Sequence, residues 1–276
     1  MIGILFIMAG TLLSEVSALI GKFEEAHKKE TIYLMGFLET FWATIFFVGI
    51  SLAKGNFYLD PASLPIFFTR AIMEIAVFTF GLLALIKADR STNGFISVMT
   101  IPLLLGIDIA LGYNISVQQM MGMLIITGAI IGLYAKRGIE ARGSAYVILW
   151  TIGAAITISL FKYNVTNYNS VEAEQGYMFL ILLAYFLVMT LWKNRGNPFP
   201  YLWKYPYNLQ SLTRGIASPI LGFAYIFAPA SIIMAIKRPF SMFWSMLSGN
   251  HYYHEKKLGI KVLYLALILV GLVLMY

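Results

Sequence analysis

Acidic side chains interrupt stretches of sequence that are otherwise apolar. Glu15 lies within the apolar segment 2–21, and Glu39 lies at a similar depth in the next apolar segment, 31–53. A carboxylate in hydrocarbon is costly unless it is protonated, paired or facing a wet cavity. If both carboxylates face one cavity, desolvation and mutual repulsion favour a bound proton near neutral pH. The expected chemistry is therefore reversible binding of a proton, an ion or a substrate, with a buried hydrogen bond as the alternative for Glu39.

A third acid has an arginine beside it. Arg70 and Glu74 lie four residues apart in the apolar segment 62–86, and this spacing places both on one face of a helix. An ion pair between them would lower the cost of placing either charge in a membrane. We therefore expect a structural pair here, with a binding role as the alternative.

Cations interrupt two later apolar segments. Arg214 has Ser218 four residues later, where the earlier arginine has an acid, so it needs another partner or an anionic ligand. Lys237 and Arg238 precede Pro239, which removes a helical hydrogen bond and can let helix ends face a ligand. Two adjacent cations at that depth indicate a role in binding the substrate or a carboxylate of the chain itself, with a structural role as the alternative.

The composition indicates that these segments lie in a membrane. The chain is 59% hydrophobic and 12% charged, with a mean hydropathy of +0.77, whereas charged residues make up about 25% of soluble domains. A polytopic membrane protein is therefore expected. The formal charge of +7 comes from cations in short loops rather than from a block, which argues against a nucleic-acid partner.

Several chemistries have no motif in the sequence. Without cysteine there is no thiolate metal site and no disulfide framework, and His251 and His254 complete no metal-binding set. No phosphate-binding Walker loop is present, which argues against direct ATP hydrolysis. We expect no catalytic residues, no metal and no cofactor, and hence a protein that is not an enzyme.

Ten apolar stretches are long enough to cross a bilayer, which takes roughly 18 to 25 residues in a helix. They fall near 2–21, 31–53, 62–86, 92–111, 117–135, 143–163, 173–192, 206–227, 229–248 and 258–275. Short loops join them, so the expected fold is an all-α membrane protein with ten transmembrane helices in one integral membrane domain.

The loop cations predict the orientation of these helices. Lys54 and Lys162 fall on the face that carries both termini. The opposite face carries Lys22, Lys28, Lys29, Lys87, Arg90, Lys136, Arg137, Arg142, Lys193, Arg195, Lys204, Lys256 and Lys257. Cytoplasmic loops carry the excess of Lys and Arg, so both termini are expected outside.

The two halves of the chain, 1–138 and 139–276, resemble each other weakly and in order. Lys54-Gly-Asn recurs as Arg195-Gly-Asn, and Thr69-Arg70 recurs as Thr213-Arg214. Pro102, Gly112 and Gly122 recur as Pro239, Gly249 and Gly259, all 137 residues later. Because each half holds five spans, the second copy must cross the membrane in the opposite sense. This pattern predicts two inverted five-helix repeats, with the binding site between them.

Two copies of five helices, with proline in the fourth and glycines in the fifth, resemble the drug/metabolite transporter superfamily in its ten-helix EamA-like form. The stretch from Gly10 to Phe23, followed by Glu24 and Glu25, is similar to the first helix of small multidrug resistance proteins, a four-helix branch of that superfamily. The resemblance implies that Glu15 matches a membrane carboxylate that binds either protons or a cationic drug. Ten-helix members usually keep both termini in the cytoplasm, so the charge distribution departs from the family topology.

These observations lead to one expected function and two alternatives. The expected function is a secondary active transporter of a small organic cation or amine-containing metabolite, working by alternating access and coupled to protons or to a counter-substrate (antiport). An amino-acid or other zwitterion carrier, including the nucleotide-sugar type, is the alternative within transport. A non-transporting membrane protein that binds or modifies lipid would explain the basic face through attraction to anionic headgroups. The expected site residues are Glu15, Glu39, Glu74, Arg70, Arg214, Lys237 and Arg238.

The remaining expectations concern partners and location. Besides a small-molecule substrate and a proton or counter-substrate, membrane lipids are the expected partners. A prokaryotic cytoplasmic (inner) membrane is the expected location. The sequence leaves the oligomeric state and the direction of transport open.

Overall fold

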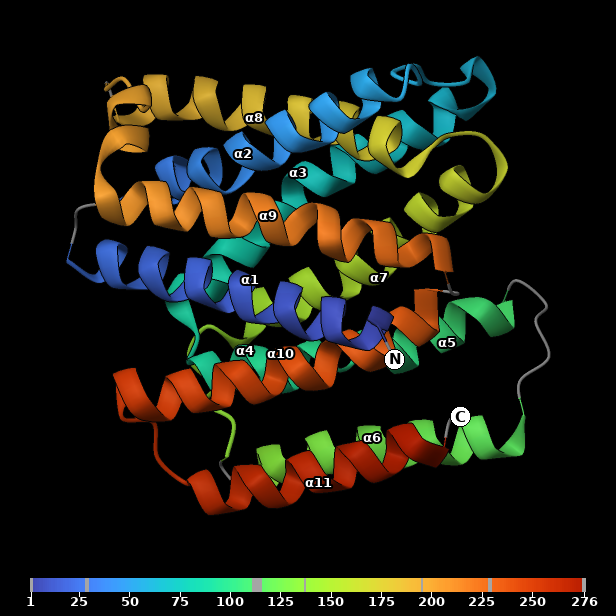
Figure 1. Ribbon diagram of the computed structural model, residues 1–276. Helices are drawn as coiled ribbons and strands as arrows, with labels where there is room; N and C mark the ends of the chain where they lie inside the picture. Colours follow the sequence, from blue (N-terminus) through green and yellow to red (C-terminus); the bar gives the residue numbers. More distant parts are fainter. Residues whose placement is uncertain are drawn as a thin grey trace. The chain divides into compact units, whose positions relative to one another are not determined.

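The computed structural model describes residues 2–27, 30–110, 116–136, 138–194, 196–227 and 230–274. These residues form eleven α-helices and two 3-10 helices (Figure 1). Five residues used above for the charge distribution and the repeat lie outside the described residues: Lys28, Lys29, Gly112, Arg137 and Arg195.

The helices are α1 (Ile2–Ala26), α2 (Ile32–Ala53), η1 (Pro61–Ser63), α3 (Leu64–Lys87), α4 (Arg90–Ser97), α5 (Thr100–Ala110), α6 (Val117–Ala135), α7 (Ser144–Asn167), α8 (Val171–Asn194), η2 (Phe199–Trp203), α9 (Tyr205–Phe227), α10 (Ala230–Tyr253) and α11 (Leu258–Leu274). They follow the expected spans in order, with α4 and α5 sharing the fourth.

Six helical segments in the described residues are long and apolar enough to cross a membrane. They are Leu5–Ala26, Ile32–Ala53, Pro61–Lys87, Val117–Ala135, Ser144–Asn167 and Val171–Lys193. Helix α11 is apolar but shorter, at 17 residues. The chain is thus an α-helical integral membrane protein, as the composition predicts.

The fourth expected span is broken into two helices. Helix α4 ends at Ser97 and α5 begins at Thr100, two residues before Pro102. A proline lacks the N–H that would continue the helix, and its ring clashes with the carbonyl four residues earlier, here that of Val98. Pro239 has no such effect, because α10 continues through it. Of the two matching prolines, only the first coincides with separate helix ends.

The chain divides into two compact units, and each contains helices from both halves of the sequence. Unit 1 comprises residues 1–82 and 160–229, and unit 2 comprises residues 83–159 and 230–276. Helices α3 and α7 contribute residues to both units.

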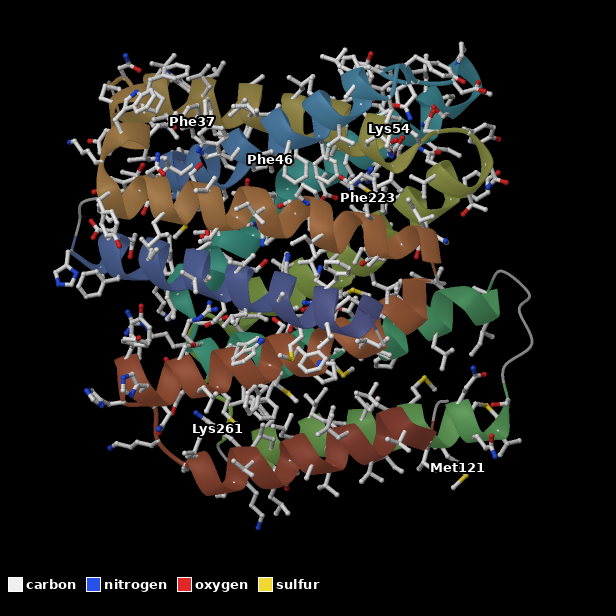
Figure 2. All side chains as sticks on the ribbon, in the orientation of Figure 1. Phe37, Phe46, Lys54, Met121, Phe223 and Lys261 are labelled. Carbon is white, nitrogen blue, oxygen red and sulfur yellow. The ribbon has the colours of Figure 1, made fainter. Side chains whose placement is uncertain are left out.

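Helix α2 is the centre of unit 1. It runs beside α8 and also packs against α9, while α9 in turn packs along α1 (Figure 1). In the apolar stretch of α2, 61% of the residues are buried, whereas 28–33% are buried in the corresponding stretches of the other five candidate spans. The C-terminal end of α2 contacts both α8 and α9. Lys54 Nζ lies 2.9 Å from Glu172 Oε1 of α8 and over the ring of Phe223 of α9 (Figure 2).

In unit 2, α4 packs on α10 and α6 packs on α11. The N-terminus of α4 has no side-chain cap from the preceding Asp89. Glu255, from the loop after α10, accepts hydrogen bonds there from the Arg90 and Ser91 backbone N–H groups. Glu255 also pairs with Lys261 of α11 at 3.1 Å. This carboxylate therefore joins three elements of unit 2.

Candidate functional site

The small residues on one side of α1 allow close approach of α9. A Cβ added at Gly10 would lie 3.0 Å from Leu221 Cγ, and one added at Gly21 would lie 2.7 Å from Gln210 Nε2. Ser17, between them on α1, is fully buried. Backbones can approach closely where side chains are this small. Polar groups of α9 therefore come within hydrogen-bonding distance of α1.

The central polar contact of unit 1 joins α9 to both α1 and α2. Arg214 Nε lies 3.4 Å from Glu39 Oε2, and Arg214 Nη1 donates to Ser14 Oγ at 3.3 Å. Arg214 thus has the acidic partner that its sequence context lacks. Glu15 follows Ser14 on α1 and is 7% exposed. Three residues singled out from the sequence, Glu15, Glu39 and Arg214, belong to this neighbourhood.

More acids lie toward the end where α1 leads into α2. Tyr207 OH donates to Glu24 Oε2 at 3.1 Å, and Gln210 Nε2 donates to Glu30 Oε1 at 3.1 Å. Glu24 and Glu30 are both buried. Tyr207, Gln210 and Arg214 follow helical spacing on α9, so one stripe of this helix meets a series of carboxylates.

Sequence reasoning missed Glu24 and Glu30 as site residues. Both lie near the ends of apolar segments, where an acid is normally solvated. A sequence signal did exist, because positions 207, 210 and 214 recur at a spacing of three and four, which places them on one face of a helix. Such a stripe predicts polar partners on the helices that face it.

The Glu30 carboxyl is perturbed by its surroundings. Burial raises the pKa of Glu30 well above its ordinary value, and the carboxylates of Glu39, Glu24 and Glu25 raise it further, against the opposing effect of the Gln210 hydrogen bond. A buried carboxyl among other acids favours its neutral form, because the ionised form loses hydration and meets like charge.

The ion pair predicted between Arg70 and Glu74 is wrong. Arg70 Nη1 lies 2.9 Å from Glu174 Oε1 instead, and its guanidinium stacks 4.7 Å from the centre of the Phe161 ring. Glu174 is fully buried and also accepts hydrogen bonds from Asn164 and Asn169. Glu174, near the start of α8, competes with Glu74 for the guanidinium, and spacing along one helix does not reveal such a competitor.

Glu74 is left in a different environment from the one expected. Its Oε2 atom is buried and has no hydrogen-bond partner among the described residues. A buried carboxylate oxygen without a partner is costly unless the group is neutral or a ligand completes it. Glu74 thus stays a candidate site residue, but without its predicted arginine.

Lys237 and Arg238 belong to unit 2. Arg238 is 5% exposed, and its Nη2 donates to Thr100 Oγ1 at 2.9 Å. Its guanidinium lies 4.9 Å from the centre of the Trp150 ring. Thr100 is the first residue of α5, so Arg238 lies at the break in the fourth span.

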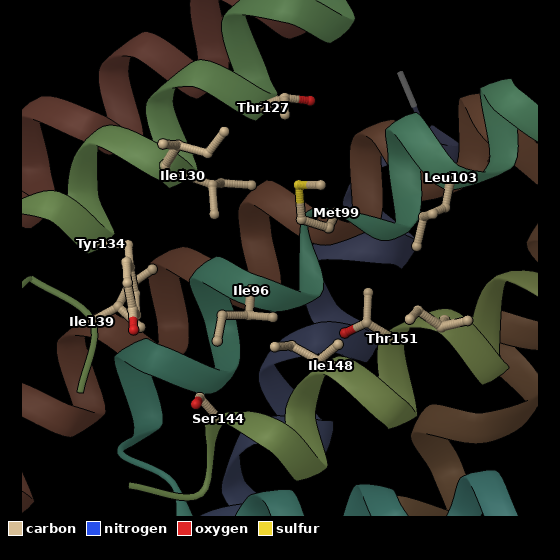
Figure 3. A pocket seen from close by; sticks show the side chains of 12 residues that line it. Ile96, Met99, Leu103, Thr127, Ile130, Tyr134, Ile139, Ser144, Ile148 and Thr151 are labelled. Atoms are coloured by element: carbon tan, nitrogen blue, oxygen red, sulfur yellow. The ribbon is translucent and has the colours of Figure 1, made fainter. Parts of the chain in front are cut away.

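Unit 2 also contains an apolar groove (Figure 3). It encloses about 470 Å³ between α4, α5, α6 and α7. Its lining is mainly aliphatic, with Tyr134 and Ser144 among the few polar groups. Lys136 and Arg142, each two residues from one of these, are exposed. A groove of this kind suits a hydrocarbon chain rather than a polar solute.

Comparisons with known proteins assign no function. No family model matches the chain, and no curated protein matches it. A solved structure described only as "Crystal structure of protein" superposes over 99% of this chain and 95% of that chain, with a TM-score of 0.67 and 14% sequence identity. The fold is a known one. At this identity the likeness concerns architecture alone.

Proposed function

We propose that the protein is a secondary active transporter of a small organic cation or amine-containing metabolite, coupled to protons or to exchange. The observation that carries the proposal is the Glu39–Arg214 ion pair, whose arginine also donates to Ser14, the residue before the buried Glu15. Ionisable residues within membrane helices mark proton and substrate pathways by default.

The Glu39–Arg214 pair has the properties of a contact that opens. Its 3.4 Å separation is long, and the Arg214 side chain is 30% exposed, so water or a ligand can reach it. The Arg70–Glu174 pair is shorter, fully buried and reinforced by neighbouring amides. We therefore assign the first pair to binding and the second to holding the fold.

Competition at the carboxylates would couple proton and substrate. With Glu15 or Glu39 ionised, a substrate amine finds a buried negative partner. With the acid protonated, the empty carrier returns without an uncompensated charge in the membrane. Alternate opening of the site to the two sides would then exchange protons for substrate.

Membership of the drug/metabolite transporter superfamily is part of the proposal. Arg70 and Arg214 occupy matching sequence positions, and each pairs with a glutamate of the opposite half, Glu174 and Glu39. Such reciprocity is what inverted repeats 1–138 and 139–276 would produce. We propose a cytoplasmic membrane location with both termini outside, following the distribution of loop cations.

Reconstituted vesicles test the proposal. Uptake driven by a pH gradient is measured for amines, amino acids, nucleotide sugars and purines, using the wild type, Glu15→Gln and Glu140→Gln. Glu140 is exposed in a loop of unit 2 and serves as the charge-matched control. We expect amine uptake in the wild type and in the control, and its loss in Glu15→Gln with an unchanged Tm. Normal transport by Glu15→Gln, with the usual pH dependence, would refute the assignment.

The same screen separates the zwitterion alternative. Amino-acid or nucleotide-sugar uptake without amine uptake would favour it. Arg214 and Lys237 or Arg238 would then hold the acidic group of the substrate.

A second candidate function is lipid binding, favoured by the groove of unit 2. Its aliphatic lining suits an acyl chain, and Lys136 and Arg142 would attract a phosphate-bearing headgroup. Native mass spectrometry with anionic and zwitterionic phospholipids tests this candidate. Selective retention of anionic lipid, lost in Lys136→Gln/Arg142→Gln, together with no solute flux in vesicles, would favour it over transport.

A further inference from the structure

Glu30 and Gln210 share one hydrogen bond and are each one partner short. Gln210 Nε2 donates to Glu30 Oε1 at 3.1 Å. Glu30 is 3% exposed and Gln210 is fully buried. Among the described residues, neither Glu30 Oε2 nor Gln210 Oε1 has a hydrogen-bond partner. Both atoms are acceptors when the carboxyl is ionised, so within the described part of the chain the pair lacks a donor.

A single proton supplies that donor. A neutral carboxylic acid has one O–H group, and a primary amide has one carbonyl oxygen and one NH₂ group. The two groups can therefore form a cyclic pair with an N–H···O bond on one side and an O–H···O bond on the other. Rotating the Gln210 amide by half a turn does not supply the donor, because it would place the amide oxygen at the position from which Nε2 now donates to Glu30 Oε1.

We propose that Glu30 is a proton-binding residue, distinct from Glu15, which holds its proton in a cyclic acid–amide pair with Gln210. The proton ties the segment between α1 and α2 to the polar stripe of α9. When the proton leaves, an acceptor is left facing a buried anion, and the contact weakens.

The surrounding charges favour the protonated form. Glu24 and Glu25 approach from α1 and Glu39 from α2, and all three act on Glu30 as negative charges. From α9, Tyr207 donates to Glu24, and Arg214 pairs with Glu39. Burial is the largest cause of the raised pKa of Glu30. The site is therefore suited to a proton and unsuited to an anion.

The inference deepens the proposed function, since its part in transport rests on proton coupling. Glu30 lies in the connection between the end of α1 and the start of α2, whereas Glu15 and Glu39 lie within these helices. It is thus placed to pass protons between the aqueous face and the membrane carboxylates. Protonation of Glu30 can be measured without measuring transport. A negative result for Glu30 can therefore be distinguished from a negative result for the proposed transport function.

Infrared spectroscopy of the purified protein in detergent tests the proposal. The C=O band of protonated carboxyl groups is followed from about pH 5 to about pH 9, above the ordinary glutamate value of about 4.3. We expect a component that persists above that value in the wild type and in Glu25→Gln and that disappears in Glu30→Gln. An unchanged band in Glu30→Gln would overturn the proposal.

An exchange variant gives an independent outcome. Glu30→Gln/Gln210→Glu swaps acid and amide, so it should restore the band that Glu30→Gln lacks. Failure of the swap to restore any protonated component, in a variant that folds, would also overturn the proposal. If Glu30→Gln does not fold, the swap compared with the wild type still tests whether the pair carries a proton.

Discussion

Arg70 of α3 and Arg214 of α9 each form an ion pair with a glutamate that lies in the opposite half of the sequence. Both arginines follow a threonine, at matching points of the proposed repeats. Their surroundings differ: the Arg70 pair has side chains 4% and 0% exposed, whereas the Arg214 side chain is 30% exposed. The arginine of the first half is therefore buried with its partner, whereas the arginine of the second half is partly exposed.

Arg70→Gln should destabilise the protein strongly. It leaves the fully buried Glu174 carboxylate without its cation, and breaking a buried pair from one side costs about 3–5 kcal/mol. Thermal unfolding in detergent should show a large fall in Tm, whereas Arg142→Gln, at an exposed loop position, should unfold like the wild type. Equal Tm values for the two variants would contradict a structural role for this pair.

Arg214→Gln should affect transport more than stability. Its partly exposed pair with Glu39 is screened by solvent, so we expect a loss of stability below about 1 kcal/mol. Uptake should fall about tenfold, which corresponds to about 1.4 kcal/mol of binding free energy. Vesicle uptake and Tm are measured on the same preparation. A large fall in Tm with proportionate loss of uptake would instead indicate a structural role.

The pH dependence of stability should change in Glu30→Gln. Because the folded-state pKa of Glu30 is raised, its proton contributes stability that is fully present below the unfolded value of about 4.3 and is lost as pH rises through the raised pKa. The wild-type Tm should therefore fall over that range more steeply than the Tm of Glu30→Gln, whose amide stays neutral. Parallel Tm curves for the two proteins would show that Glu30 takes up no proton on folding.

Two glycines of α2 should respond in opposite ways to alanine. A Cβ at Gly36 would lie 2.3 Å from Phe186 Cδ1, whereas nothing lies within 4 Å of one at Gly49. Gly36→Ala should cost about 1–3 kcal/mol through overpacking, and Gly49→Ala should stabilise by about 0.5–1 kcal/mol. Thermal unfolding of the two variants gives the sign of each effect. A stabilised Gly36→Ala would mean that α8 lies farther from α2.

Glu255→Gln should destabilise unit 2, and a second substitution should repair part of the damage. Glutamine cannot neutralise Lys261, which is buried and pairs with Glu255, and leaving it uncompensated costs about 3–5 kcal/mol. Glu255→Gln/Lys261→Met removes both charges, so its Tm should lie closer to the wild type. If the double variant is less stable than the single one, the lysine has another dominant partner.

The candidate site was only partly predictable. Glu15 and Glu39 were identifiable because a charge within an apolar segment conflicts with its expected surroundings, and the missing partner of Arg214 was apparent from Ser218. The identity of that partner was not, since α2 and α9 are distant in sequence. Helical spacing favoured Arg70 with Glu74, but Glu174 lies closer in space. Local spacing says nothing about competitors on other helices.

The sequence by itself determined that this is a helical membrane protein and where most of its spans lie, because hydrocarbon requires long apolar helices whose backbone bonds are satisfied internally. It also identified Pro102 and Pro239 without distinguishing the broken span from the continuous one. Only the tertiary structure decided which buried charges meet, because pairing depends on how helices from different halves lie side by side. The Glu30–Gln210 contact belongs to this second class.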